Sequence, residues 1–129
     1  MEKRNDHPTA TRQYLIVEAN VLVASDLLET IMEWKPKASV TVCRTPDAAC
    51  ELLRNRGAVD MVILGIGGEA LRRSALLDWL EDHPVRLVVM EGVLKNGLTL
   101  RRGHATLARP FVAEMVHAAL SSAAGEAAV

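Results

Sequence analysis

The sequence has few aromatic residues: two tryptophans, one tyrosine and one phenylalanine among 129 residues. Single-stranded nucleic acid is usually bound on aromatic stacking platforms, which this chain cannot supply in number. No charge of one sign dominates, because 15 Lys and Arg face 16 Asp and Glu, for a formal net charge of −1. No overall field therefore draws the molecule to nucleic acid or to an anionic membrane. We expect neither as a direct partner.

Cysteine and long apolar runs are also scarce. Cys43 and Cys50 fall in different predicted elements without metal-ligand company, so we expect two reduced, mostly buried thiols. No apolar run approaches the roughly 20 residues needed to cross a bilayer, and the charged N-terminus lacks the apolar centre of a secretory signal. We expect a cytoplasmic protein with a mobile arm (residues 1–12), one folded domain (13–122) and a frayed tail (123–129).

Catalytic motifs are absent as well. The chain has no Gly-x-Ser-x-Gly elbow, no His-Glu-x-x-His and no paired-cysteine motif. Trp34 and Trp79 fall at helical positions and are interpreted as packing or interface residues. We therefore assign no catalytic residue, no metal ligands and no cofactor, and expect a protein that is not an enzyme.

What the sequence does contain is an alternation of apolar, β-branched runs with stretches at helical spacing. The runs predict five strands, at residues 14–17, 39–43, 59–64, 85–90 and 105–108. Helices are expected after Asn20, from Thr45-Pro46, across residues 74–82 and from about residue 111 to 122. Short connections between such elements require crossover packing, which predicts a doubly wound α/β domain with a parallel sheet.

Two of these helices have a clear predicted inner face. In the first helix, the expected buried residues are Leu22, Leu27, Leu28, Ile31 and Met32. In the last helix, they are Val112, Met115, Val116, Ala119 and Leu120.

Four segments resemble the landmark segments of bacterial response-regulator receiver domains: residues 15–20, 59–66, 85–91 and 109–111, in this order. The resemblance spans about residues 13–122. It implies a flavodoxin-like (CheY-like) five-stranded fold with strand order 2-1-3-4-5. Receiver domains are phosphorylated on an aspartate after the third strand, with magnesium held by an acidic pair after the first. A hydroxyl residue after the fourth strand and a lysine before the proline of the fifth contact the phosphoryl group.

Position by position, the resemblance places the acidic pair on Glu18 and Ala19, the acceptor on Gly65, the hydroxyl on Glu91 and the lysine on Arg109. Gly65 has no side-chain nucleophile, so no acyl phosphate can form there. Magnesium needs several hard oxygen ligands, and Glu18 alone should not hold it. The chain is thus interpreted as a degenerate pseudo-receiver. Either Arg109 pairs with Glu91 or Glu18 in place of the phosphoryl contact, or these side chains are independent and exposed.

The segment between Glu91 and Arg109 departs further from the family, because its 17 residues include several glycines. We expect the fourth helix of the family to be short, irregular or absent. The segment is locally basic through Lys95, Arg101, Arg102 and His104, which form a candidate interaction surface; a solvated loop is the alternative.

Two functions remain open at this point. The first is a stand-alone pseudo-receiver in two-component or phosphorelay signalling that binds a protein without phosphorylation. Its partner would be a kinase, a regulator or a second copy in a homodimer. The second is a ligand or anion sensor that reuses the fold through a loop containing Gly65, Gly67 and Gly68, whose backbone N–H groups could form an anion nest.

Overall fold

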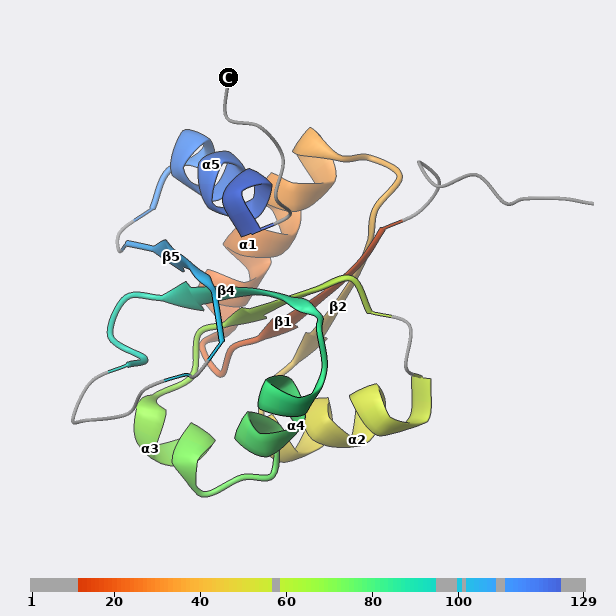
Figure 1. The fold of residues 1–129 in the computed structure, drawn as a ribbon. Helices are drawn as coiled ribbons and strands as arrows, with labels where there is room; N and C mark the ends of the chain where they lie inside the picture. Colours follow the sequence, from red (N-terminus) through yellow and green to blue (C-terminus); the bar gives the residue numbers. More distant parts are fainter. Residues whose placement is uncertain (1–11, 57–58, 95–99, 101, 109–110, 124–129) are drawn as a thin grey trace, which may run out of the picture.

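Five parallel strands form a single sheet in the order β2-β1-β3-β4-β5, with helices on both faces (Figure 1). The structure is a computed structural model that describes residues 12–56, 59–94, 100, 102–108 and 111–123. The elements are β1 (Gln13–Val17), α1 (Val21–Trp34), β2 (Ser39–Cys43), α2 (Pro46–Arg56), β3 (Met61–Leu64), α3 (Gly68–Arg72), α4 (Leu76–Asp82), β4 (Arg86–Met90), β5 (Ala105–Leu107) and α5 (Ala113–Ala123). The predicted fold class and strand order are confirmed.

The helices divide into two layers. Helices α1 and α5 pack together on one face of the sheet, and α2, α3 and α4 lie on the other (Figure 1). Strands covered on both faces are apolar throughout, and every residue of β3 is accordingly buried. Of the helices that the structure describes, none combines the length and the apolar character that a membrane span requires.

The five predicted strands are all present; β2 has the predicted bounds, and no end of the others differs from prediction by more than two residues. The largest difference is at β3, which begins at Met61 instead of Val59. The Asp60 Oδ2 accepts a hydrogen bond of 2.7 Å from the Gln13 backbone N–H. The Arg12 carbonyl accepts another of 2.8 Å from the Ser39 N–H, so the last residue of the expected arm already contacts the sheet. Cys43 and Cys50 are both buried, as predicted, and the structure does not join them in a disulfide.

Helix α1 begins at the predicted N-cap, but two residues of its predicted inner face are exposed. The Asn20 side chain accepts hydrogen bonds from the backbone N–H groups of residues 22 and 23, which satisfies two of the free donors of the first turn. The buried stripe of α1 is Ala24, Leu27 and Ile31. Leu22 precedes Ala24 by two residues, about 200° around the helix, and is 76% exposed. Met32 lies one residue past the stripe and is also exposed.

Helix α5 shows a similar correction at its start. Val116, Ala119 and Leu120 are buried as predicted. Val112 is 57% exposed because the helix begins only at Ala113, so this side chain precedes the first turn instead of joining the inner face.

The connections on the two sides of β4 differ from each other. Before β4, the predicted helix over residues 74–82 is found as α4, and the short helix α3 precedes it without having been predicted. After β4, the described residues 91–94, 100 and 102–104 contain no helix, in line with the expected loss of regular structure there. Residues 95–99 and 101 lie outside the described part of the chain.

Candidate functional site

The carboxyl ends of three neighbouring strands bring Glu18, Gly65 and Glu91 to one edge of the sheet. Each residue directly follows its strand and extends the backbone pairing by one step. The Glu18 N–H donates to the Cys43 carbonyl (3.0 Å), the Gly65 N–H to the Val17 carbonyl (2.8 Å) and the Glu91 N–H to the Leu107 carbonyl (2.7 Å). This edge is where ligands bind in open α/β sheets.

The Glu18 side chain turns into this edge and lies against Gly65. Glu18 is only 4% exposed, and its Oε2 accepts a hydrogen bond of 2.9 Å from the Asn20 N–H. A Cβ atom added at Gly65 would overlap the Glu18 Oε1 and would lie 2.9 Å from the Met90 Sδ and 3.0 Å from the Glu18 Cδ. The Glu18 carboxylate therefore occupies the volume into which a side chain at position 65 would extend.

The beginning of α1 fixes Glu18 in this position. The same residue, Asn20, donates its backbone N–H to Glu18 and accepts two N–H groups of α1 with its side chain. A carboxylate beside the N-terminus of a helix is also favoured by the helix dipole. The orientation of Glu18 is thus coupled to the cap of a 14-residue helix.

Of the remaining residues expected at this edge, the structure describes Ala19 and Glu91. Ala19 is exposed and carries no side-chain oxygen, and Glu91 is exposed on the rim. Arg109 lies outside the described residues, so both alternatives, its pairing with Glu91 or Glu18 and independent exposed side chains, stay predictions.

The donor set does not fit magnesium, the metal that the resemblance implies. Mg²⁺ prefers octahedral coordination by hard oxygens, commonly including more than one carboxylate in a protein site. Ala19 and Gly65 supply no side-chain oxygen, and one oxygen of Glu18 already accepts the Asn20 N–H. Within the described ranges, no group of three His, Cys, Asp or Glu residues gathers as a metal site would need.

The predicted glycine loop is partly helical. Gly65 is buried, Gly67 is the N-cap of α3, and Gly68 is the first residue of that helix. The short α3 was missed because consecutive glycines disfavour helix. Glu69 supports it, pairing with Arg72 at 3.5 Å and Arg73 at 3.3 Å at the spacings that meet on a helix surface.

The four residues of the predicted basic surface have different outcomes in the structure. His104 is exposed, whereas Lys95 and Arg101 lie outside the described residues. The sequence predicts that Arg102 projects into solvent, and the structure differs. Its guanidinium donates to the backbone carbonyls of Leu80 (2.8 Å), His83 (2.8 Å) and Val85. Burial lowers the pKa of Arg102 from its ordinary value.

The Arg102 contacts form a C-terminal anchor for α4. The last carbonyls of a helix have no partner within the helix, and a guanidinium fork can satisfy several of them at once. Arg102 thereby fastens the segment before β5 to the α4–β4 turn, in a part of the chain where the described residues form no helix. The local run of positive charge signalled an arginine-rich loop but gave no indication that one arginine binds the α4–β4 turn.

Comparisons with known proteins show which solved structures share this fold. No protein-family model and no curated protein matches the sequence. Among solved structures, the N-terminal domain of a response regulator/sensory box/GGDEF three-domain protein from Carboxydothermus hydrogenoformans is similar, with a TM-score of 0.69 and 14% identity over 88% of this chain and 94% of that one. A response regulator receiver domain protein from Bacillus halodurans has a TM-score of 0.67 and 18% identity, covering 88% and 97%. The chain has the receiver fold.

A third similar structure is the response regulator PhyR from Brucella abortus, with a TM-score of 0.66 and 21% identity over 90% of this chain. This chain spans about half of PhyR, since 49% of that chain is covered. In the receiver fold, the edge that carries Glu18, Gly65 and Glu91 is the one that the resemblance assigned to phosphorylation. The described side chains there supply one buried carboxylate in contact with a glycine.

Proposed function

We propose that this receiver-fold chain is a pseudo-receiver that acts in two-component or phosphorelay signalling by binding a protein irrespective of phosphorylation. The observation that carries the proposal is the Glu18 carboxylate packed into the volume beside Gly65. Phosphotransfer to a receiver needs a side-chain oxygen nucleophile and a metal at this point. A glycine offers no such oxygen, and a fixed carboxylate repels an incoming phosphoryl group.

The same geometry supports a role other than catalysis. An activated nucleophile needs a nearby base and space for the substrate. At this edge, Glu18 is the buried acidic residue, and its Oε2 accepts a backbone N–H instead of facing a hydroxyl or thiol. The solved structures similar to this chain are titled response regulators and receiver domains, which favours signalling as the context.

Exposed aliphatic side chains at the starts of α1 and α5 supply a candidate docking surface. Val21 is 58% exposed, Leu22 76% and Val112 57%. Both helices begin at the carboxyl edge of the sheet and lie on the same face (Figure 1). Large exposed aliphatic groups are typical of protein contact sites when they gather in one region. The partner in this proposal is a kinase, a regulator or a second copy of the chain.

The test is retention of interacting proteins on immobilised chain, with acetyl phosphate and magnesium present or absent. We expect the same proteins to be retained in both conditions. Leu22→Asp should abolish retention without unfolding the domain, because Leu22 is exposed and a carboxylate is favoured in the first turn. Met32→Gln, on the same helix, is the matched control and should bind as wild type. Retention that requires the phosphodonor would contradict the proposal.

The alternative, an anion sensor at the glycine segment, is less well supported. A backbone nest needs residues of alternating left- and right-handed conformation. Among the described residues, the glycine with positive φ is Gly92 (φ 99°), not Gly65, Gly67 or Gly68. The adjacent Glu18 carboxylate would also repel an anion held at Gly65.

A further inference from the structure

A groove of about 630 Å³ lies at the amino edge of the sheet, opposite the Glu18 edge. It is bounded by α2, α4 and the residues that enter β3 and β4, including Leu53, Val59 and Val85. Its volume falls within the range of small-molecule sites, roughly 300 to 1,000 Å³. Nothing in the signalling proposal uses this groove, because it is separated from Gly65 and Leu64 by the length of the sheet.

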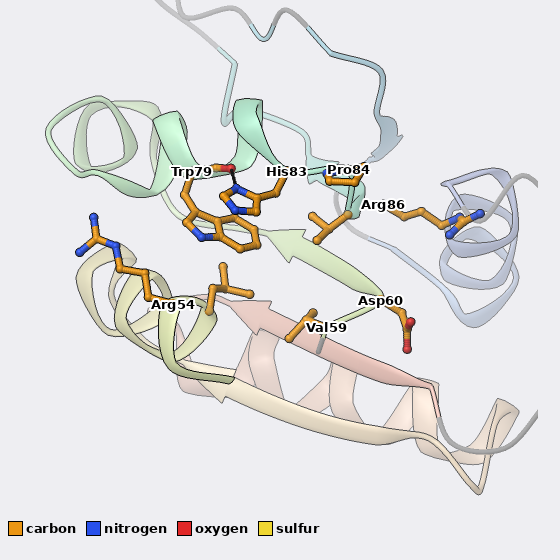
Figure 2. Close-up of a pocket in the computed structure, with 9 residues that line it drawn as sticks. Arg54, Val59, Asp60, Trp79, His83, Pro84 and Arg86 are labelled. Carbon is orange, nitrogen blue, oxygen red and sulfur yellow. Dashed lines mark hydrogen bonds between the residues drawn. The ribbon is translucent and has the colours of Figure 1, made fainter. Parts of the chain in front are cut away.

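One wall of the groove is a preformed aromatic pair. The Trp79 and His83 rings are stacked, with centroids 3.9 Å apart and planes 4° from parallel. The His83 Nδ1 lies 2.8 Å from the Trp79 carbonyl oxygen. Since a carbonyl only accepts, this contact places the proton on Nδ1 and leaves Nε2 of the neutral ring as an acceptor. Figure 2 shows both rings on the α4 side of the groove, across from Val59.

Cationic side chains lie at the two ends of the groove. Figure 2 shows Arg54, from α2, at one end and Arg86, from β4, at the other, with both side chains extending outward from the groove. Both are exposed. The acidic residue in the lining is Asp60, whose Oδ2 accepts the Gln13 N–H. The groove thus carries an excess of positive charge in a chain whose formal net charge is −1.

We infer that this groove binds a small heteroaromatic anion of the nucleoside monophosphate class. A flat heterocycle packs against the Trp79–His83 wall over the apolar floor formed by Val59 and Val85. The His83 Nε2 accepts a hydrogen bond from a ring or exocyclic N–H of the ligand. The anionic group reaches an arginine, whose planar fork matches phosphate or carboxylate oxygens.

The direct test is calorimetric titration of the whole chain with AMP, GMP and flavin mononucleotide. We expect at least one of these three compounds to bind. It should bind at least tenfold more tightly than either of its parts, which for AMP are adenosine and ribose 5-phosphate. The Arg54→Gln, Arg86→Gln double variant should bind more weakly than wild type. Of the two single variants, the one that removes the arginine holding the anionic group should lose roughly three- to tenfold in affinity. Arg73→Gln, which changes an exposed arginine of the Glu69 pair, is the matched control and should bind as wild type.

Tryptophan fluorescence locates the site without changing a residue of the groove. In a Trp34→Phe background Trp79 is the remaining tryptophan, and the bound ligand should quench its emission. Binding without such quenching would overturn the assignment. So would the absence of binding by all three probes, binding no tighter than that of ribose 5-phosphate, or an equal loss of affinity in Arg73→Gln. None of these outcomes bears on the pseudo-receiver proposal, whose site lies at the other edge of the sheet.

Discussion

Glu18 and Gly65 share one volume at the carboxyl edge of the sheet: the carboxylate of the first lies where a side chain on the second would begin. The two residues follow adjacent strands, since Val17 pairs with Leu64 in the β1–β3 register. In this receiver fold, the absence of a side chain at position 65 and the burial of the Glu18 carboxylate are therefore one structural feature.

The first prediction is that Gly65→Ala destabilises the domain. The added methyl would overlap the Glu18 Oε1 and crowd the Met90 Sδ, so we expect a loss of about 1 to 3 kcal/mol in the free energy of unfolding. Gly67→Ala is the matched control, because a Cβ there meets nothing within 4 Å. Urea denaturation of both variants measures the difference. Equal stability of the two would show that the Glu18 contact is not tight.

A second prediction concerns the coupling between the two residues. Glu18→Ala should relieve the crowding, so Gly65→Ala should cost less in that background than in the wild type. We expect an interaction free energy of about 1 kcal/mol, a typical value for residues in contact. A double-mutant cycle measured by urea denaturation gives this number directly. Strict additivity would mean that Glu18 moves away at no cost.

The third prediction concerns the Arg102 anchor. Arg102→Ala leaves the carbonyls of Leu80, His83 and Val85 without their donor, and we expect a loss of about 2 kcal/mol in stability. Arg102→Lys should recover only part of it, because an ammonium does not reproduce the planar fork. Thermal and urea unfolding of the two variants test this. If Arg102→Ala were as stable as the wild type, the contacts of Arg102 would not anchor α4, and the sequence-based view of Arg102 as a solvent-exposed surface residue would hold.

The fourth prediction is that an aspartate at position 65 alone does not restore phosphorylation. In Gly65→Asp, the new carboxylate meets Glu18, and Ala19 still leaves magnesium short of ligands. We expect efficient labelling by a small-molecule phosphodonor only when Ala19→Asp and Glu91→Thr are added. Robust labelling of the single variant would mean that Glu18 and Ala19 do not block the site.

The sequence predicts the fold well because its strand and helix signals agree with one another. Continuous apolar runs mark the strands that are buried on both faces, and Asn20 and Pro46 mark helix starts that the structure has. The failures concern details of rotation and length. Leu22 is apolar yet exposed because the buried stripe of α1 is set by Ala24, Leu27 and Ile31. The short α3 was hidden by the glycine at its N-cap, Gly67, and the glycine at its first position, Gly68.

The site is only partly readable from the sequence. The resemblance identifies Glu18 and Gly65 as positions of interest: Glu18 keeps the acidic side chain expected there, and Gly65 lacks the expected acceptor. It does not show that the Glu18 side chain fills the space beside Gly65, because that depends on the rotamer and on the Asn20 N–H that holds it. Arg102 likewise looks like part of a basic loop, and the carbonyls that it binds come from residues 17 to 22 positions earlier in the chain.

The measurement that tests the central claim most directly is the intact mass of the wild-type chain after incubation with acetyl phosphate and magnesium. We predict an unchanged mass, with the Gly65→Asp, Ala19→Asp, Glu91→Thr triple variant as the positive control that gains one phosphoryl group. A phosphoryl adduct on the wild type, mapped to the carboxyl edge of the sheet, would contradict the proposal that this receiver-fold chain functions without phosphotransfer.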